Sequence, residues 1–174
     1  TGLVGLGQGP GTFSYWPLEG DGRYHFETVA WDDSGKSEAD PYGEGDRTVV
    51  YDTQIAAPVG LAALPASWAT TDVFTVTWTN PADLSGIGAA YYKVGDFPGS
   101  DVDGLRVPGN DLSVLTGIRV PGEGRHALWV WLEDRAGNID YQTARGVWLR
   151  YDASVGAPSG LAVQPAVWTP SDTF

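Results

Sequence analysis

An internal copy constrains the fold of this chain more than any single motif does. Residues 51–74 and 151–174 are identical at 12 of 24 aligned positions, at a spacing of 100. Upstream the match continues at a spacing of 102, where Gly20-Asp-Gly-Arg23 corresponds to Gly122-Glu-Gly-Arg125. The copy predicts a tandem array with a unit of about 100 residues, the size of one small β-domain.

The register of the copy divides the chain into three parts. Residues 1–52 correspond to the C-terminal part of one unit, residues 53–152 to a complete unit, and residues 153–174 to the start of a further one. We expect the chain to be a segment of a longer repetitive polypeptide. We also expect the partial units to be completed by neighbouring sequence rather than by a strand from another molecule, although edge strands invite such pairing.

Composition excludes several classes of partner. A formal net charge of −12 argues against nucleic acid, which needs a basic protein surface, and against docking on anionic lipid. The chain has no cysteine, so disulfides and zinc–thiolate sites are excluded. No apolar stretch approaches the roughly 18 residues of a membrane span, so direct membrane insertion is not expected. The 24 Gly and 12 Pro residues are dispersed, which favours short strands joined by tight turns.

Alternation with a period of two predicts β-strands throughout the complete unit. Phe74, Val76 and Trp78 alternate with threonines, which is typical of a half-buried strand ending at Asn80-Pro81. Further strands are expected at residues 61–64, 92–94, 105–107, 112–120, 126–133 and 147–151. About seven strands at this spacing predict an all-β, antiparallel sandwich of two sheets.

Two groups of residues resemble a known family. Val76-Thr-Trp-Thr-Asn-Pro81, followed by Ile87 and Tyr91-Tyr-Lys-Val94, resembles the second and third strands of fibronectin type III domains. Asp32-Asp-Ser-Gly35 and Asp134-Arg-Ala-Gly-Asn138 resemble a corner of bacterial immunoglobulin-like repeats. The resemblance implies tandem immunoglobulin-like or fibronectin type III-like repeats of a large extracellular protein. It is specific for architecture but not for function, because such sandwiches have many roles.

The Asp/Gly corners have a simple physical interpretation. An Asp side chain can bond the backbone two residues on, and Gly adopts the positive φ that closes a tight turn. We therefore predict that Asp32 and Asp134 form turns rather than take part in catalysis.

The pattern of histidines and carboxylates favours a non-catalytic protein. His25 and His126 are not equivalent in the two units, and neither lies near a serine nucleophile motif or an HExxH spacing. No motif pairs two carboxylates across a cleft. His126 stands where Tyr24 and the usual family tyrosine stand, so the second unit departs from the tyrosine corner that the resemblance implies.

Aromatic residues mark the candidate binding or interface surface. If Leu128, Val130 and Leu132 point inward, Trp129 and Trp131 on the same strand point outward. Trp148 points outward on the last strand, beside Arg150 at the next outward position. The fibronectin-like strand order would place these strands next to the one that carries Tyr91 and Lys93. We expect one contiguous aromatic face, which usually marks an interface or a ligand platform.

Three interpretations of this face are open. We rank assembly or domain contact first, a local cluster in which Arg145 and Arg150 cover the indoles second, and stacking on sugar rings third. The first unit has Glu27, Val29 and Thr48 where the second has its tryptophans, so the face is not a fixed property of the fold. An interface predicts that Trp131→Ala weakens association while the unit stays folded.

Four aspartates are candidate calcium ligands. Asp101 and Asp103 form half of a D-x-D-x-D-G loop, and Asp52 and Asp152 follow tyrosine at the boundaries between units. Calcium requires six to eight oxygen ligands, and the sequence brings only one or two together. We favour the simpler interpretation, in which these aspartates form turns and caps and no cofactor is required.

The sequence therefore predicts a structural or adhesive function. We expect a spacer and assembly module at the cell surface or in a fibre, with neighbouring repeats as partners and self-association or polysaccharide binding as further roles. The alternatives are an accessory module of a large secreted hydrolase and a carbohydrate-binding module that uses the tryptophan face.

Overall fold

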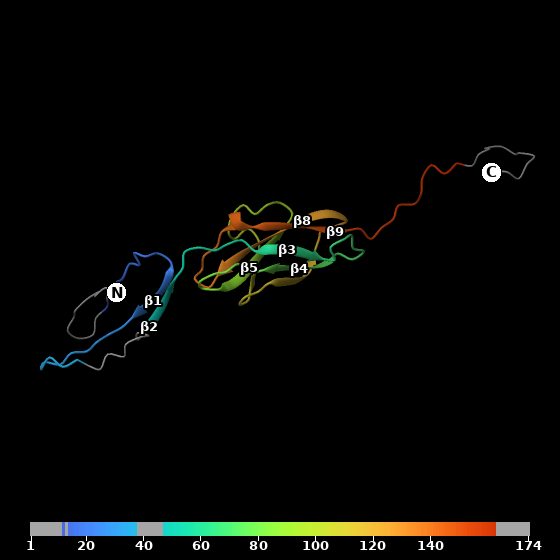
Figure 1. The fold of residues 1–174 in the computed structure, drawn as a ribbon. Coiled ribbons are helices and arrows are strands. Elements are labelled where there is room, and N and C mark those ends of the chain that lie inside the picture. Colours follow the sequence, from blue (N-terminus) through green and yellow to red (C-terminus); the bar gives the residue numbers. More distant parts are fainter. Residues whose placement is uncertain (1–11, 13, 38–46, 163–174) are drawn as a thin grey trace, which may run out of the picture.

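The chain folds into antiparallel β-structure. The computed structural model describes residue 12, residues 14–37 and residues 47–162 (Figure 1). The strands of this part are β1 (Gly22–Phe26), β2 (Arg47–Tyr51), β3 (Val59–Leu64), β4 (Val73–Thr79), β5 (Ile87–Val94), β6 (Leu105–Pro108), β7 (Val114–Arg119), β8 (Gly124–Asp134) and β9 (Arg145–Tyr151). A three-residue 3-10 turn, η1 (Tyr141–Thr143), follows β8. Among the described residues, no helix has the length and apolar character to cross a membrane.

Two antiparallel sheets enclose one core. One sheet has the order β3-β4-β7 and the other has the order β6-β5-β8-β9. Their inner faces meet in a single cluster to which every strand from β3 to β9 contributes. This sandwich-like arrangement confirms the predicted all-β class, and each predicted strand overlaps one of β3–β9. The repeated Trp168 and the strands expected beyond residue 162 lie outside the described residues.

Strand β4 shows why the alternating sequence folds in this way. Phe74, Val76 and Trp78 are buried between the sheets, whereas the threonines between them stay at least partly exposed. Each apolar side chain buried in this way contributes about 1.5–3 kcal/mol. The period-two pattern thus fixes which face of the strand turns toward the core.

Both Asp/Gly corners form the predicted turns. Oδ1 of Asp32 accepts a hydrogen bond from the Lys36 amide at 2.9 Å, and Oδ1 of Asp134 accepts one from the Asn138 amide at 2.8 Å. The glycine three positions after each aspartate has a positive φ, of 80° and 93° respectively. The corners therefore follow from local sequence alone.

Strands β1 and β2 form a separate hairpin whose register equals that of β8 and β9. Tyr24 lies opposite Val49 in the first hairpin, and His126 lies opposite Leu149 in the second. These pairs are related by the same spacings of 102 and 100 that relate the sequences. The backbone frames match, although Val49 is 46% exposed and Leu149 is completely buried.

Tyr24 and His126 make equivalent corner contacts. The Tyr24 hydroxyl donates to the Gly20 carbonyl, and Nε2 of His126 donates to the Gly122 carbonyl at 2.8 Å. In both hairpins the side chain reaches the carbonyl four residues earlier. His126 therefore makes the same corner hydrogen bond as the tyrosine at the aligned position.

Candidate functional site

The outer face of the four-stranded sheet carries the predicted aromatic residues. Register places Tyr91 of β5 opposite Trp131 of β8, Lys93 opposite Trp129, and Trp148 of β9 opposite Ala127. Tyr91 and Trp131 belong to a second cluster that is separate from the core between the sheets. The predicted neighbours β5, β8 and β9 and their shared face are therefore confirmed.

The expectation that all four aromatics form one accessible patch is wrong. Tyr91 is 7% exposed and Trp131 is fully buried, and their rings stack with centroids 5.4 Å apart. The indole N–H of Trp131 donates to the Asp101 carbonyl at 2.9 Å, and buried Ala144 packs in the same cluster. The connections around Asp101 and Ala144 thus cover half of the face, a tertiary effect that strand alternation does not reveal.

Two glycines provide space for the indoles. A Cβ atom on Gly104 would lie 2.4 Å from Cη2 of Trp131 and 2.7 Å from the carbonyl oxygen of Tyr92. A Cβ atom on Gly146 would lie 2.7 Å from Cζ3 of Trp129. All three distances are far below van der Waals contact, so the rings lie directly against glycine backbone. In the sequence, Gly104 and Gly146 were the residues that could have indicated indoles packed against backbone. The alternation of strand residues alone indicated only that the tryptophans point outward.

The solvent-accessible part of the outer face is smaller than expected. Phe97 is 45% exposed and packs edge-to-face on half-buried Trp129, with centroids 4.9 Å apart. Trp148 is half exposed, and the Arg125 guanidinium lies 5.2 Å from its ring centroid. The second-ranked interpretation, in which Arg145 and Arg150 cover the indoles, is not met. Arg125 takes this position at Trp148, while the Arg145 and Arg150 side chains bond backbone carbonyls.

Ion pairs occupy the polar positions of the same sheet. Arg106 binds both carboxylate oxygens of Glu133, at 2.6 and 2.7 Å, and this hydrogen-bonded pairing lowers the pKa of Glu133. Burial, together with the nearby Glu133 charge, raises the pKa of Tyr91. Lys93, another predicted interface residue, pairs with Asp103 at 2.7 Å. Its ammonium group is therefore already engaged within the same sheet and its adjoining loop.

The boundary between the hairpin and the two sheets forms a second candidate site. The Thr53 hydroxyl donates to Oδ1 of Asp21 at 2.9 Å, on the turn before β1. The neighbouring Asp52 accepts the Ser85 amide through Oδ2 at 3.0 Å, and its carbonyl accepts Nδ2 of Asn138 at 2.8 Å. Asp52 and Thr53 form the linker between the hairpin and the two sheets. Thr53 is bonded to the hairpin, and Asp52 is bonded to loops of the two sheets.

The exit of the second unit repeats half of this arrangement. Glu123, the counterpart of Asp21, accepts the Ala153 amide at 3.0 Å and the Ser154 hydroxyl at 2.7 Å. The Ser154 hydroxyl is the main cause that lowers the pKa of Glu123. An acid on the preceding turn therefore holds the start of the linker in both hairpins.

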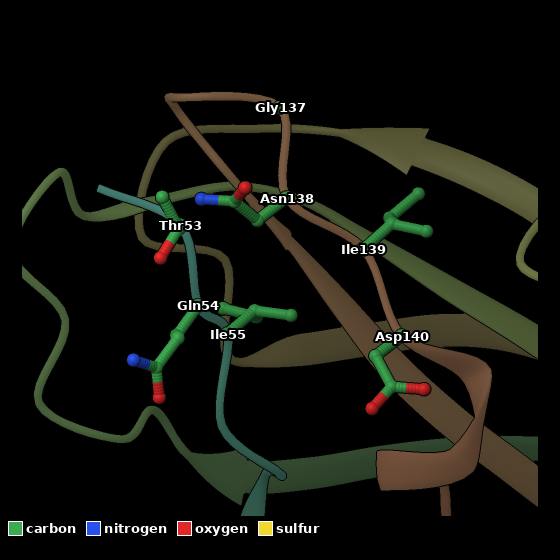
Figure 2. Close-up of a pocket in the computed structure, with 7 residues that line it drawn as sticks. All are labelled: Thr53, Gln54, Ile55, Gly137, Asn138, Ile139 and Asp140. Atoms are coloured by element: carbon green, nitrogen blue, oxygen red, sulfur yellow. The ribbon is translucent and has the colours of Figure 1, made fainter. Parts of the chain in front are cut away.

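A shallow recess opens where the linker enters the second unit. Its volume is about 430 Å³, and residues 53–55 and 137–140 line it. Figure 2 shows the linker on one side of the recess and the corner after β8 on the other. Ile55 is buried here, so the linker is already part of the core within three residues of Asp52.

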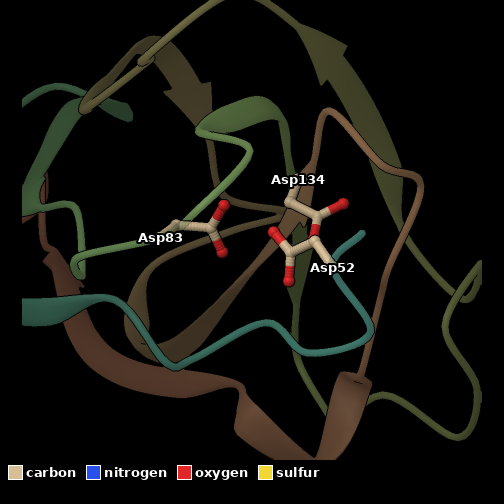
Figure 3. Close-up of side chains that lie close together, drawn as sticks. All are labelled: Asp52, Asp83 and Asp134. Carbon is tan, nitrogen blue, oxygen red and sulfur yellow. The ribbon is translucent and has the colours of Figure 1, made fainter. Parts of the chain in front are cut away.

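Three aspartates converge beside this recess. The carboxylates of Asp52, Asp83 and Asp134 lie within 4.8 Å of one another, and Asp134 is 1% exposed (Figure 3). None of the ion pairs among the described residues involves them. Carboxylate oxygens are ligands that calcium prefers, although calcium requires six to eight of them. The same oxygens accept hydrogen bonds from residues 85, 86 and 138, which is the turn-and-cap role we favoured.

The four predicted calcium candidates do not come together. Only Asp52 belongs to the cluster, while the partner carboxylates Asp83 and Asp134 were not among the candidates. Asp103 is paired with Lys93, and Oδ1 of Asp101 accepts the Tyr141 amide at 2.9 Å. Asp152 lies at the opposite boundary, where its amide donates to the Ala69 carbonyl.

The two histidines have local contacts. Nδ1 of His25 lies 2.9 Å from the Thr48 hydroxyl across the first hairpin, and His126 makes the corner contact described above.

Comparison with known proteins adds no family or activity, since neither a protein-family model nor a curated protein matches the chain.

Proposed function

We propose that this chain is a non-catalytic segment of a tandem array of immunoglobulin-like or fibronectin type III-like sandwiches, which acts as a spacer in an extracellular or surface-attached protein. The sequence copy and the equal register of the two hairpins support the tandem organisation. The family resemblance and the acidic composition are compatible with an extracellular location.

One observation carries the spacer role. The linker is bonded on both sides, by Thr53 to Asp21 of the first part and by Asp52 to Ser85 and Asn138 of the second. A linker with these contacts transmits orientation, whereas a free linker would let successive units rotate independently. Pro58, which is fully buried, further restricts the entering chain because its ring fixes φ.

The spacer length follows from strand geometry. A strand of about ten residues spans roughly 33 Å at about 3.3 Å per residue. The chain enters the unit at one end and leaves at the other (Figure 1). Each unit therefore extends the array by approximately its own strand length, which suits a stalk that displaces a functional tip from a surface.

A distance measurement between the two parts tests this proposal. Because the chain contains no cysteine, Arg23→Cys and Thr116→Cys introduce two unique sites for spin labels, one on exposed β1 and one on exposed β7. Electron–electron double resonance then reports the distribution of distances between the parts. We expect one narrow distribution in the otherwise unchanged chain.

The variant Thr53→Val removes the hydroxyl that bonds Asp21, and we expect it to broaden this distribution. Thr48→Val is the matched control, since Thr48 bonds His25 within the hairpin. A distribution that is already broad before substitution, or one that both variants broaden equally, would contradict an orienting linker.

A further inference from the structure

An exposed tryptophan recurs between the units without contributing to the buried core. Trp68, in the connection between β3 and β4, is 54% exposed, and the same residue recurs as Trp168. A single exposed aromatic side chain needs no explanation of its own, but Trp68 recurs at the same place in the next copy of the sequence. Burial within its own unit therefore does not account for the recurrence of this indole.

The backbone holds the Trp68 connection against the exit of the chain. The Ala69 amide donates to the Arg150 carbonyl, and the Asp152 amide donates to the Ala69 carbonyl, both at 2.9 Å. Nη1 of Arg150 also donates to the Ala66 carbonyl at 3.0 Å. Figure 1 places this connection at the end of the unit where β9 leads into the following residues. Trp68 is therefore anchored beside the first residues of the next unit.

The opposite end of a unit carries the recess described above. Its first wall consists of Thr53, Gln54 and Ile55, which directly follow Asp52, the counterpart of Asp152. Asp152 bonds the Trp68 connection, and the residue after it, Ala153, is the counterpart of Thr53 at the start of the next recess. The Cα atoms of these consecutive residues are about 3.8 Å apart. The backbone that anchors the Trp68 connection therefore leads directly into the recess that follows it in the chain.

We propose that the Trp68 indole packs into the entry recess of the next unit, so that successive units of the array contact each other directly. This inference rests on the proposed tandem function and names its contact surface. The recess is mainly polar: half-buried Ile139 offers an apolar contact for one part of the ring, and Gln54 and Asp140 offer acceptors for the indole N–H (Figure 2). The occupant is the preceding unit of the same polypeptide.

A chain of two complete units tests the contact. All residues of the core between the sheets fall between Ile55 and Tyr151, so residues 53–152 contain the core of an independent unit. Joining two copies of residues 53–152 recreates the sequence Tyr-Asp-Thr-Gln-Ile at the joint, as at residues 51–55. With isotope label in the second copy only, nuclear magnetic resonance reports the amide shifts of Gly137–Asp140 and the rotational correlation time.

Trp68→Ala in the first copy should return the Gly137–Asp140 shifts of the second copy to those of a single unit. The correlation time should also fall toward the single-unit value. Trp68→Ala in the second copy is the matched control, because no unit follows it, and it should change neither quantity. Unchanged shifts in the first-copy variant, or equal changes in both variants, would overturn the contact. Neither result decides the spacer function, which the distance measurement on Thr53→Val tests separately.

Discussion

The hairpins β1–β2 and β8–β9 share a backbone but differ in side-chain burial. Both have the same register, the same type of Asp/Gly corner and the same corner hydrogen bond, from Tyr24 in one and His126 in the other. Yet Val49 is 46% exposed where Leu149 is completely buried. The hydrogen-bonded frame thus depends on local motifs, whereas burial depends on strands β3–β7, which only the second hairpin has among the described residues.

The two outer faces extend this difference. Strand β8 carries half-buried Trp129 and buried Trp131, while the aligned residues Glu27 and Val29 of the first part are exposed and follow the end of β1. Substitutions at aligned positions therefore compare a residue that the covering layers bury with one that they leave exposed.

The largest expected effect is at Trp131. Trp131→Ala removes a fully buried indole that stacks on Tyr91, and such large-to-small changes cost about 3–5 kcal/mol. Val29→Ala, at the matched position with 40% exposure, should change stability by no more than about 0.5 kcal/mol. Urea denaturation followed by circular dichroism measures both. This replaces the sequence-based expectation that the unit stays folded, and equal midpoints for the two variants would contradict it.

The corner aspartates should show the next largest difference. Asp134 is 1% exposed, and its two oxygens accept the Asn138 amide and Nδ2, so Asp134→Ala should cost about 2–3 kcal/mol. Asp32 makes the same type of turn in solvent, and Asp32→Ala should cost clearly less. The midpoints of thermal unfolding compare the two. Equal losses would show that the turn, and not its burial, carries the energy.

The sequence predicted the features that depend on local pattern. Strand faces followed from alternation, as at Phe74 and Val76, and the Asp134 corner followed from its turn motif. The cover over Trp131 depends on loops that are distant in sequence, so alternation predicted exposure instead. Likewise Asp83 meets Asp52 only because separate connections converge at one end of the unit, and no spacing in the sequence encodes that meeting.

Gly104 tests whether the covered indole requires a glycine beside it. Gly104→Ala places a methyl group against Trp131 and the Tyr92 carbonyl, and overpacking of this kind costs about 1–3 kcal/mol. Gly122→Ala is the matched control, since no atom lies within 4 Å of its added Cβ. Denaturation midpoints again decide, and a neutral Gly104→Ala would mean that Trp131 moves aside without cost.

His126 tests the interchangeable corner. His126→Phe removes the hydrogen bond to the Gly122 carbonyl and should cost about 1 kcal/mol. His126→Tyr should recover much of that loss, because Tyr24 makes the same contact in the first hairpin. Thermal unfolding of both variants gives the comparison. If tyrosine is no better than phenylalanine, the two corners are not equivalent.

The smallest effect should be the pH dependence of the exit linker. Hydrogen bonds from Ser154 and Ala153 hold the pKa of Glu123 below its ordinary value of 4.5. A depressed pKa in the folded state means that these contacts contribute fully above pH 4.5 and are lost as the pH falls through the lower folded value. The Ala153 amide resonance should therefore shift over that acidic range, and Glu123→Gln should abolish the shift.

The entry linker offers the contrast, because the main chain of Asp52 is also bonded to Asn138 and should keep its order when the acid on the preceding turn is neutralised. An Ala153 shift that persists in Glu123→Gln would assign the pH response to another carboxylate and remove the parallel between the two linkers.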